Sequence, residues 1–174
     1  MPILEARTMR SVRSVLWADE ADCAATAQAL AGHASLRTAC IELHGNLGAG
    51  KTSFVRHLLR ALGVAGAIKS PTYAVMEPYA LPGLAIWHFD FYRFEDPQEF
   101  EDAGFREVFA SPGLKLVEWP EKAVGLLPPC DLRIEIAMVD ALLADALNDA
   151  DGDDTRRQVT FQAETPLGLA LLLP

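Results

Sequence analysis

The chain has 174 residues, of which 51% are hydrophobic and 22% charged. These values are typical of one globular domain with a hydrophobic core, so we expect a single domain over residues 1–174. The net charge of −9 argues against a broad basic surface, and we expect neither DNA nor a membrane as a partner. No run approaches the roughly 18 apolar residues of a membrane span, and the start lacks the apolar core of a signal peptide, so we expect a cytoplasmic protein.

The first third of the chain predicts two strands and two helices. Residues 10–17 alternate in polarity and indicate a strand. Asp19 is a typical cap for the alanine-rich helix that follows, which we expect to end near Gly32. Residues 38–44 predict a second strand, and residues 52–62 carry their apolar side chains on one helical stripe.

The middle of the chain predicts a hairpin, a helix and a short buried strand. Residues 73–79 and 84–89 read as two strands around a Leu81-Pro82-Gly83 turn. Asp96 and Pro97 suit the cap and first position of a helix that runs to about residue 103. Residues 114–117 form an apolar strand that ends in Glu118.

The last part of the chain predicts two strands separated by an acidic insertion. Residues 132–138 alternate strictly, which indicates a half-exposed, antiparallel edge strand. Residues 139–157 hold six aspartates and no aromatic residue, and we expect a short helix over 140–147 and a mobile acidic loop over 148–157. Val159 and Phe161 indicate the last strand.

Residues 45–52, with the sequence GNLGAGKT, match the phosphate-binding P-loop. Glycines let such a loop aim successive backbone N–H groups at an anion, and the following helix adds its positive end. Lys51 is expected to reach the outer phosphates and the Thr52 hydroxyl to bind Mg²⁺. The predicted strand, loop and helix are the context that the motif requires, although Glu42 and His44 interrupt the strand.

Other candidate site residues stand at or near strand ends. Glu118 and Asp90 each end an apolar strand and could bind the metal or order a nucleophile. Alternatively, Glu118 could be an ordinary solvated strand end and Asp90 a loop cap. His88 lies on the same strand face as Asp90 and could be a base or a packed histidine. Thr72 follows Ser-Pro in a connection where nucleotide switches often carry a hydroxyl. Trp119 could stack on a base or pack.

Five motifs occur along the chain, namely GNLGAGKT (45–52), KSPTY (69–73), HFDFYR (88–93), DPQEFEDAGF (96–105) and LVEWPEK (116–122). In this order and spacing they resemble the TsaE (YjeE) family, the small bacterial P-loop ATPases of tRNA threonylcarbamoyladenosine synthesis. The resemblance covers roughly residues 10–138. No N-K-x-D element for guanine is present, which leaves adenine by elimination.

The resemblance implies a compact α/β P-loop NTPase-type domain with a mixed sheet flanked by helices, which binds and slowly hydrolyses ATP with Mg²⁺. It implies TsaB and TsaD as partners, with tRNA reached indirectly through their complex. The metal ligands fall on Thr52 and Glu118, and the catalytic positions on Lys51, Thr72, Asp90 and Glu118. The nucleotide contacts fall on Glu20, Leu47, Gly48, Ala49, Gly50, Lys51, Thr52 and Trp119.

Two features depart from the family pattern. Asn46 stands inside the loop where the family usually has Asp, which keeps the turn geometry but removes a charge near the phosphates. The acidic stretch 139–157 looks like an insertion for which the family pattern gives no role.

Three functions are compatible with these residues. The first is an ATPase subunit of the tRNA-modifying complex that does not itself transfer the threonylcarbamoyl group. The second is a nucleotide-dependent switch with negligible hydrolysis, which would share every binding residue. The third is a small-molecule kinase, which would need an arginine-bearing lid, and the only arginine pair, Arg156-Arg157, falls in the acidic stretch.

Overall fold

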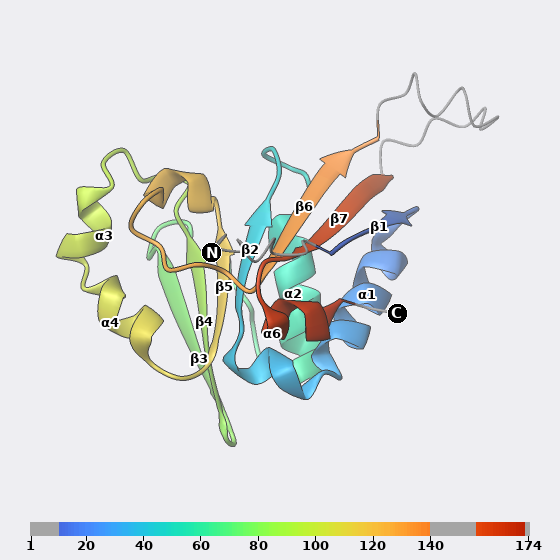
Figure 1. Cartoon of the computed structure of the whole chain (residues 1–174), viewed down its shortest axis with the longest axis horizontal. Helices are drawn as coiled ribbons and strands as arrows, with labels where there is room; N and C mark the ends of the chain where they lie inside the picture. The colour runs from blue at the N-terminus through green and yellow to red at the C-terminus, as the bar shows by residue number, and fades with distance from the viewer. Residues whose placement is uncertain (1–10, 140–155, 173–174) are drawn as a thin grey trace, which may run out of the picture.

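The computed structural model describes residues 11–139 and 156–172, and it contains one seven-stranded mixed sheet with helices packed against it (Figure 1). The strand order is β1-β7-β6-β2-β5-β4-β3. The four strands β6, β2, β5 and β4 run parallel, and the pairs β1–β7, β6–β7 and β3–β4 are antiparallel. The predicted α/β class with a mixed sheet is therefore confirmed.

Figure 1 colours the helices and strands in chain order, from blue near the N-terminus to red near the C-terminus. They are β1 (Val12–Trp17), α1 (Glu20–Ala31), η1 (Ala34–Thr38), β2 (Cys40–His44), α2 (Lys51–Leu62), β3 (Met76–Leu81), β4 (Leu84–Asp90), α3 (Gln98–Asp102), α4 (Phe105–Ala110), β5 (Leu114–Glu118), η2 (Pro120–Ala123), β6 (Leu132–Met138), β7 (Arg157–Ala163) and α6 (Pro166–Leu171). No helix in the described ranges is long and apolar enough to cross a membrane.

Local signals account for the ends of the first two helices. The Asp19 carboxylate accepts hydrogen bonds from the backbone N–H groups of Ala21 and Asp22, at 2.8 and 3.1 Å, so the predicted cap of α1 is confirmed. Helix α2 ends at Gly63, whose left-handed φ of 103° lets its N–H reach back to the carbonyls of the last turn.

Apolar side chains form a core on each face of the sheet. Helices α1 and α2 pack together on one face, where they cover the aliphatic side chains of the central strands. In Figure 1, α3 and α4 lie away from α1 and α2, beside the β3–β4 end of the sheet. Their side chains join an aromatic cluster on the other face, which consists of Phe89, Phe91, Phe94, Phe100, Phe105, Val117 and Ala123.

The prediction that residues 132–138 form an antiparallel edge strand is wrong. Strand β6 lies inside the sheet, parallel to β2 and antiparallel to β7. Its alternating pattern is real, because Leu132, Ile134 and Ile136 are buried while their neighbours are partly or fully exposed. The alternation reports one solvated face of the strand and carries no information about how many strands lie beside it.

Several predicted boundaries also differ. The strand predicted over 38–44 starts at Cys40 because the turn η1 extends to Thr38, and the strand predicted over 73–79 starts only at Met76. The helix predicted over 96–103 is shorter, and a second helix, α4, follows it. The assigned helix α3 starts after Pro97, yet the Asp96 carboxylate still accepts the Gln98 N–H at 2.9 Å.

Most of the predicted acidic insertion lies outside the described residues, including the whole of the expected 140–147 helix. Its last residue, Arg157, belongs to β7, so the predicted loop over 148–157 extends too far. The expected last strand around Val159 and Phe161 is this strand, which pairs β1 with β6.

The polar residues that interrupt the central strand β2 have a specific place. Glu42 and His44 face a cavity beside η2, on the side of the strand opposite Ile41 and Leu43. Their side chains contact each other, with His44 Nε2 2.9 Å from Glu42 Oε2. The strand is therefore buried on one face and half open on the other, which explains the mixture of polar and apolar residues.

Asp131 ties the C-terminal helix to the start of β2. Its carboxylate accepts the Cys40 backbone N–H at 2.8 Å and the Thr165 hydroxyl at 2.7 Å. Thr165 in turn caps α6 by accepting the Gly168 N–H at 3.1 Å. Gly168 packs so closely that a Cβ added there would lie 1.7 Å from the Asp131 carbonyl oxygen. This contact fixes α6 against the sheet.

We expect Gly168→Ala to destabilise the protein by about 1–3 kcal/mol, because the methyl group must displace backbone rather than a flexible side chain. Gly32→Ala is the matched control, since its Cβ would lie 3.4 Å from the Ala29 carbonyl and its φ of −72° suits alanine. Urea unfolding of the two variants measures the difference. Equal stability of both variants would contradict the close packing of α6.

Candidate functional site

The P-loop connects β2 to α2 and contains three glycines whose positive φ angles would strain other residues, namely Gly45, Gly48 and Gly50. Gly45 has a φ of 142°, and a Cβ there would lie 2.3 Å from the Ile136 carbonyl oxygen of β6. Gly50 precedes the first helical residue with a φ of 113°. The Ala49 N–H closes a turn onto the Asn46 carbonyl at 3.1 Å. The loop therefore folds back against the sheet and directs α2's first turn at the site.

Lys51 begins α2, and its ammonium group lies inside the loop. Its Nζ donates to the carbonyl oxygens of Gly45 and Asn46, at 2.6 and 3.0 Å. The side chain is only 5% exposed. Burial lowers the pKa of Lys51, and the nearby carboxylates of Glu118, Glu121 and Asp90 act in the opposite direction. The positive charge is thus held close to the loop where an anion would bind.

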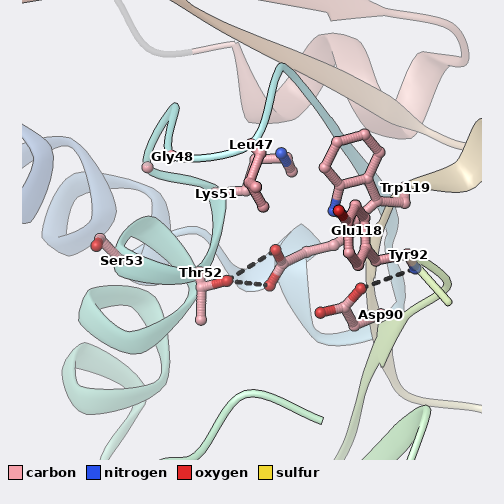
Figure 2. Close-up of a pocket in the computed structure, with 10 residues that line it drawn as sticks. Leu47, Gly48, Lys51, Thr52, Ser53, Asp90, Tyr92, Glu118 and Trp119 are labelled. Carbon is pink, nitrogen blue, oxygen red and sulfur yellow. Dashed lines mark hydrogen bonds between the residues drawn. The ribbon is translucent and has the colours of Figure 1, made fainter. Parts of the chain in front are cut away.

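Thr52, the next residue of α2, contacts the end of β5. Its hydroxyl lies 3.0 and 2.8 Å from the two carboxylate oxygens of Glu118, as Figure 2 shows. Glu118 is 2% exposed, so this carboxylate is almost wholly removed from water. The structure therefore brings together the two residues expected to bind the metal.

Strand register places the second carboxylate beside the first. Strands β4 and β5 are parallel neighbours, and Asp90 stands directly opposite Glu118. Both side chains point into the same cavity in Figure 2, in front of the P-loop and α2. The two carboxylates that the sequence analysis singled out therefore lie at one edge of the sheet, where parallel strands end.

The Asp90 carboxylate is held by three groups from its own side of the site. Its Oδ2 accepts the Thr72 hydroxyl at 3.0 Å and the Ser70 hydroxyl at 3.3 Å. Its Oδ1 accepts the Tyr92 backbone N–H at 3.0 Å. Thr72 therefore contacts the site through Asp90, and Ser70, 2.7 Å from the Thr72 hydroxyl, is a member of this network that the sequence analysis missed.

In the described residues, positive φ angles outside glycine occur only at Val75, at 65°, and Trp119, at 57°, and both adjoin the site. Val75 turns the Ser70–Thr72 segment toward β4, since its N–H bonds to the Pro71 carbonyl and its own carbonyl accepts the Asp90 N–H. Trp119 turns the chain directly after Glu118. A left-handed backbone at a β-branched or bulky residue is costly, and its location here indicates that the site geometry is held by its surroundings.

The Trp119 ring covers the ammonium group of Lys51. Nζ lies 4.0 Å from the ring centroid, and the Tyr92 ring lies on the tryptophan at 4.9 Å, tilted by 51°. A cation over an indole face is a favourable contact. The tryptophan therefore packs against both the Lys51 ammonium group and the Tyr92 ring.

These side chains enclose a cavity of about 210 Å³. Of the predicted site residues, the cavity is lined by Leu47, Gly48, Gly50, Lys51, Thr52, Asp90, Glu118 and Trp119. Ala49 is buried and lines a neighbouring cavity, and Thr72 contacts the cavity residue Asp90 through its hydroxyl. Ser53 and Tyr92 also line the cavity but were missed, although Ser53 directly follows the motif and Tyr92 lies in the HFDFYR segment.

Glu20 is not brought into this cavity. It lines a neighbouring cavity of about 230 Å³ on the other side of the P-loop, together with Trp17 and Ser53. Its carboxylate lies 3.0 Å from His57 Nε2 of α2. Arg157 of β7 lines the same cavity and donates to the Ala49 carbonyl at 2.9 Å, a contact that sequence spacing does not reveal.

The residues at the site fit a magnesium ion that is bound together with phosphates. No group of three or more His, Cys, Asp or Glu side chains within residues 11–139 and 156–172 is arranged to hold a metal alone. Mg²⁺ in phosphate sites needs only one or two protein oxygen ligands, with the rest supplied by phosphate and water. The Thr52 hydroxyl and Glu118 carboxylate, in contact at the end of the P-loop, supply such a pair.

Comparison with known proteins identifies relatives with the same fold. The chain is 44% identical over 128 residues to the tRNA threonylcarbamoyladenosine biosynthesis protein TsaE of Haemophilus influenzae, covering 74% of this chain and 72% of that protein. It is 37% identical over 123 residues to the Bacillus subtilis protein of the same name, covering 71% and 68%. The crystal structure of Bacillus subtilis YdiB superposes with a TM-score of 0.68 at 25% identity, over 94% of this chain and 93% of that one.

The family model described as threonylcarbamoyl adenosine biosynthesis protein TsaE matches residues 17–142. This match includes the P-loop, Asp90 and Glu118, and it covers most of the described sheet. The chain therefore belongs to the TsaE family of tRNA threonylcarbamoyladenosine biosynthesis proteins.

Proposed function

We propose that this protein binds ATP with Mg²⁺ and hydrolyses it as the ATPase subunit of the bacterial tRNA threonylcarbamoyladenosine complex. The observation that carries the proposal is the contact between Thr52 and Glu118 at the end of the P-loop. A P-loop alone only binds phosphates, whereas hydrolysis also needs a metal carboxylate and a group that orders the nucleophile. The juxtaposition of Glu118 and Asp90 beside the loop supports both requirements.

Each residue then has a distinct task. The P-loop N–H groups and Lys51 bind the phosphates, and Thr52 and Glu118 hold the magnesium ion, which would offset charge on the phosphate oxygens. Asp90 orients the attacking water, because its carboxylate lines the same cavity and is fixed by Thr72 and the Tyr92 N–H. Glu20 and the cavity beside it contact the rest of the nucleotide.

Membership of the family supports a proposal about partners and location. We infer that the chain acts as one domain in the cytoplasm with TsaB and TsaD, and that it meets tRNA only through them. The net charge of −9 supports this indirect contact, because a chain that held tRNA itself would need a basic surface. Its hydrolysis would support turnover of the transferase without forming the modified base.

The kinase alternative finds no support in the described residues. A kinase of this type closes an arginine-bearing lid over the phosphates. Arg157 instead belongs to the paired strand β7 and donates to the Ala49 carbonyl of the P-loop. The switch alternative uses the same binding residues, and a rate of hydrolysis separates it from the ATPase.

ATP hydrolysis by the pure protein, alone and with purified TsaB and TsaD, with and without tRNA, tests the proposal. We expect slow turnover alone and strong stimulation by the two partners. Tight ATP binding with no stimulation would favour the switch. Absence of Mg-dependent ATP binding would contradict both.

Lys51→Ala should weaken ATP binding about 10- to 150-fold, because a charge-assisted phosphate contact contributes on the order of 1.5–3 kcal/mol. Isothermal titration calorimetry measures the affinity. Lys122→Ala removes the same charge from an exposed position in η2 and should leave the affinity unchanged. Unchanged binding in Lys51→Ala would refute the P-loop assignment.

Glu118→Gln and Asp90→Asn should each lower ATP turnover in the assembled complex by about 100-fold or more, since both remove a charge from the reacting centre while preserving shape. ATP binding in the presence of excess chelator is the control and should be retained. If neither variant lowers turnover, the catalytic assignment of both carboxylates is wrong.

A further inference from the structure

His88 is a fully buried histidine directly behind the site. It lies on β4 two residues before Asp90, and its side chain is 0% exposed. In the register of β4 and β5 it stands opposite Leu116, so its ring must reach along the sheet to the end of β5. Its Nε2 lies 2.7 Å from Glu118 Oε1, which is the shortest hydrogen bond given to that carboxylate.

This bond is the imidazole's one polar contact among the described residues. The other ring nitrogen, Nδ1, is buried without a hydrogen-bond partner there. A buried polar atom without a partner is costly, and an apolar side chain of similar size would avoid that cost. What a histidine supplies here, and leucine could not, is the contact with Glu118.

The His88 contact gives the Glu118 carboxylate a second partner besides the Thr52 hydroxyl. We assign the His88 ring proton to Nε2, because Nε2 is the ring nitrogen that faces Glu118 and a carboxylate oxygen accepts hydrogen bonds. Oε1 accepts from this donor inside the sheet and also lies 3.0 Å from the Thr52 hydroxyl, while Oε2 has, within the described residues, only its 2.8 Å contact with that hydroxyl. The carboxylate is thereby fixed in rotation with one oxygen toward the P-loop.

We propose that His88 is a positioning residue that orients the Glu118 carboxylate for magnesium, through its Nε2–H. The inference rests on the proposed Mg-dependent ATP binding and extends it to a residue that would touch neither metal nor nucleotide. Groups that hold a metal-binding carboxylate from behind typically change metal affinity 10- to 100-fold when they are removed. His88 therefore acts on the magnesium-dependent part of ATP binding and leaves the phosphate contacts of the P-loop unchanged.

Three substitutions separate this role from simple packing. His88→Gln keeps a donor, because the glutamine amide nitrogen can occupy about the position of Nε2. His88→Asn is the matched control, since its shorter amide corresponds to Nδ1 and cannot reach Glu118. His88→Leu fills the space without any donor. ATP affinity is measured by calorimetry for each full-length variant, first with saturating Mg²⁺ and then with excess chelator.

We expect the enhancement of ATP affinity by Mg²⁺ to fall about tenfold or more in His88→Leu and His88→Asn and to stay within about threefold of the original in His88→Gln. Affinity in chelator should be the same in all variants. Equal magnesium enhancement in every variant would overturn the inference, as would a parallel loss with and without magnesium, which indicates a packing role.

The unfolding midpoint gives an independent readout. His88→Leu should shift the midpoint only slightly, because it removes an unpartnered buried nitrogen but also removes a hydrogen-bond partner of the buried Glu118 carboxylate. If His88→Leu does not fold, the comparison of His88→Gln with His88→Asn decides the question alone. Measurements on the original chain separate failure of the proposed function from failure of the role of His88. If Mg²⁺ does not raise the ATP affinity of the original chain, the proposed function is refuted. If Mg²⁺ raises it equally in the original chain and in the variants, only the role of His88 is refuted.

Discussion

The contact between the Thr52 hydroxyl and the Glu118 carboxylate is the interaction on which the arrangement of the site depends. It joins the first turn of α2 to the end of β5, and the strand order favours it, because α2 follows β2 and β2 is the parallel neighbour of β5. The loop that leaves β2 must also turn sharply, which Gly45 allows by passing against the Ile136 carbonyl. The strand order and Gly45 therefore place the first turn of α2 close to the Glu118 carboxylate.

Burial of charge is the second constraint, since Lys51, Asp90 and Glu118 are each at most 5% exposed. Removing such groups from water is costly unless each finds partners. Lys51 uses loop carbonyls, Asp90 uses hydroxyls and a backbone N–H, and Glu118 uses Thr52 and His88. Because the two carboxylates have separate sets of partners, each orientation is fixed independently of the other.

The sequence predicted what local chemistry determines. The Asp19 cap, the P-loop followed by a helix, and the hairpin around Gly83 all rest on residues close to one another in the chain. The errors arise where tertiary contacts decide. Strand β3 starts later than predicted because Val75 adopts a positive φ, with its carbonyl accepting the Asp90 N–H. Strand β6 was predicted to be an edge strand because alternating polarity does not reveal how many strands lie beside it. The candidate residues Asp90 and Glu118 were identifiable as strand ends, but their pairing was not.

That pairing depends on the register of β4 and β5, and the aromatic cluster on the far face accounts for it. Phe89 and Val117 are opposite each other and belong to this cluster, one residue before Asp90 and Glu118. Because successive side chains alternate between faces, a slip of one residue in either strand would turn its carboxylate toward the phenylalanines and its apolar neighbour toward the P-loop. The rings of Phe91, Phe105 and Phe109 that contact Phe89 therefore do more than fill a core. They make the slipped register costly, and so hold the two carboxylates on the P-loop side of the sheet.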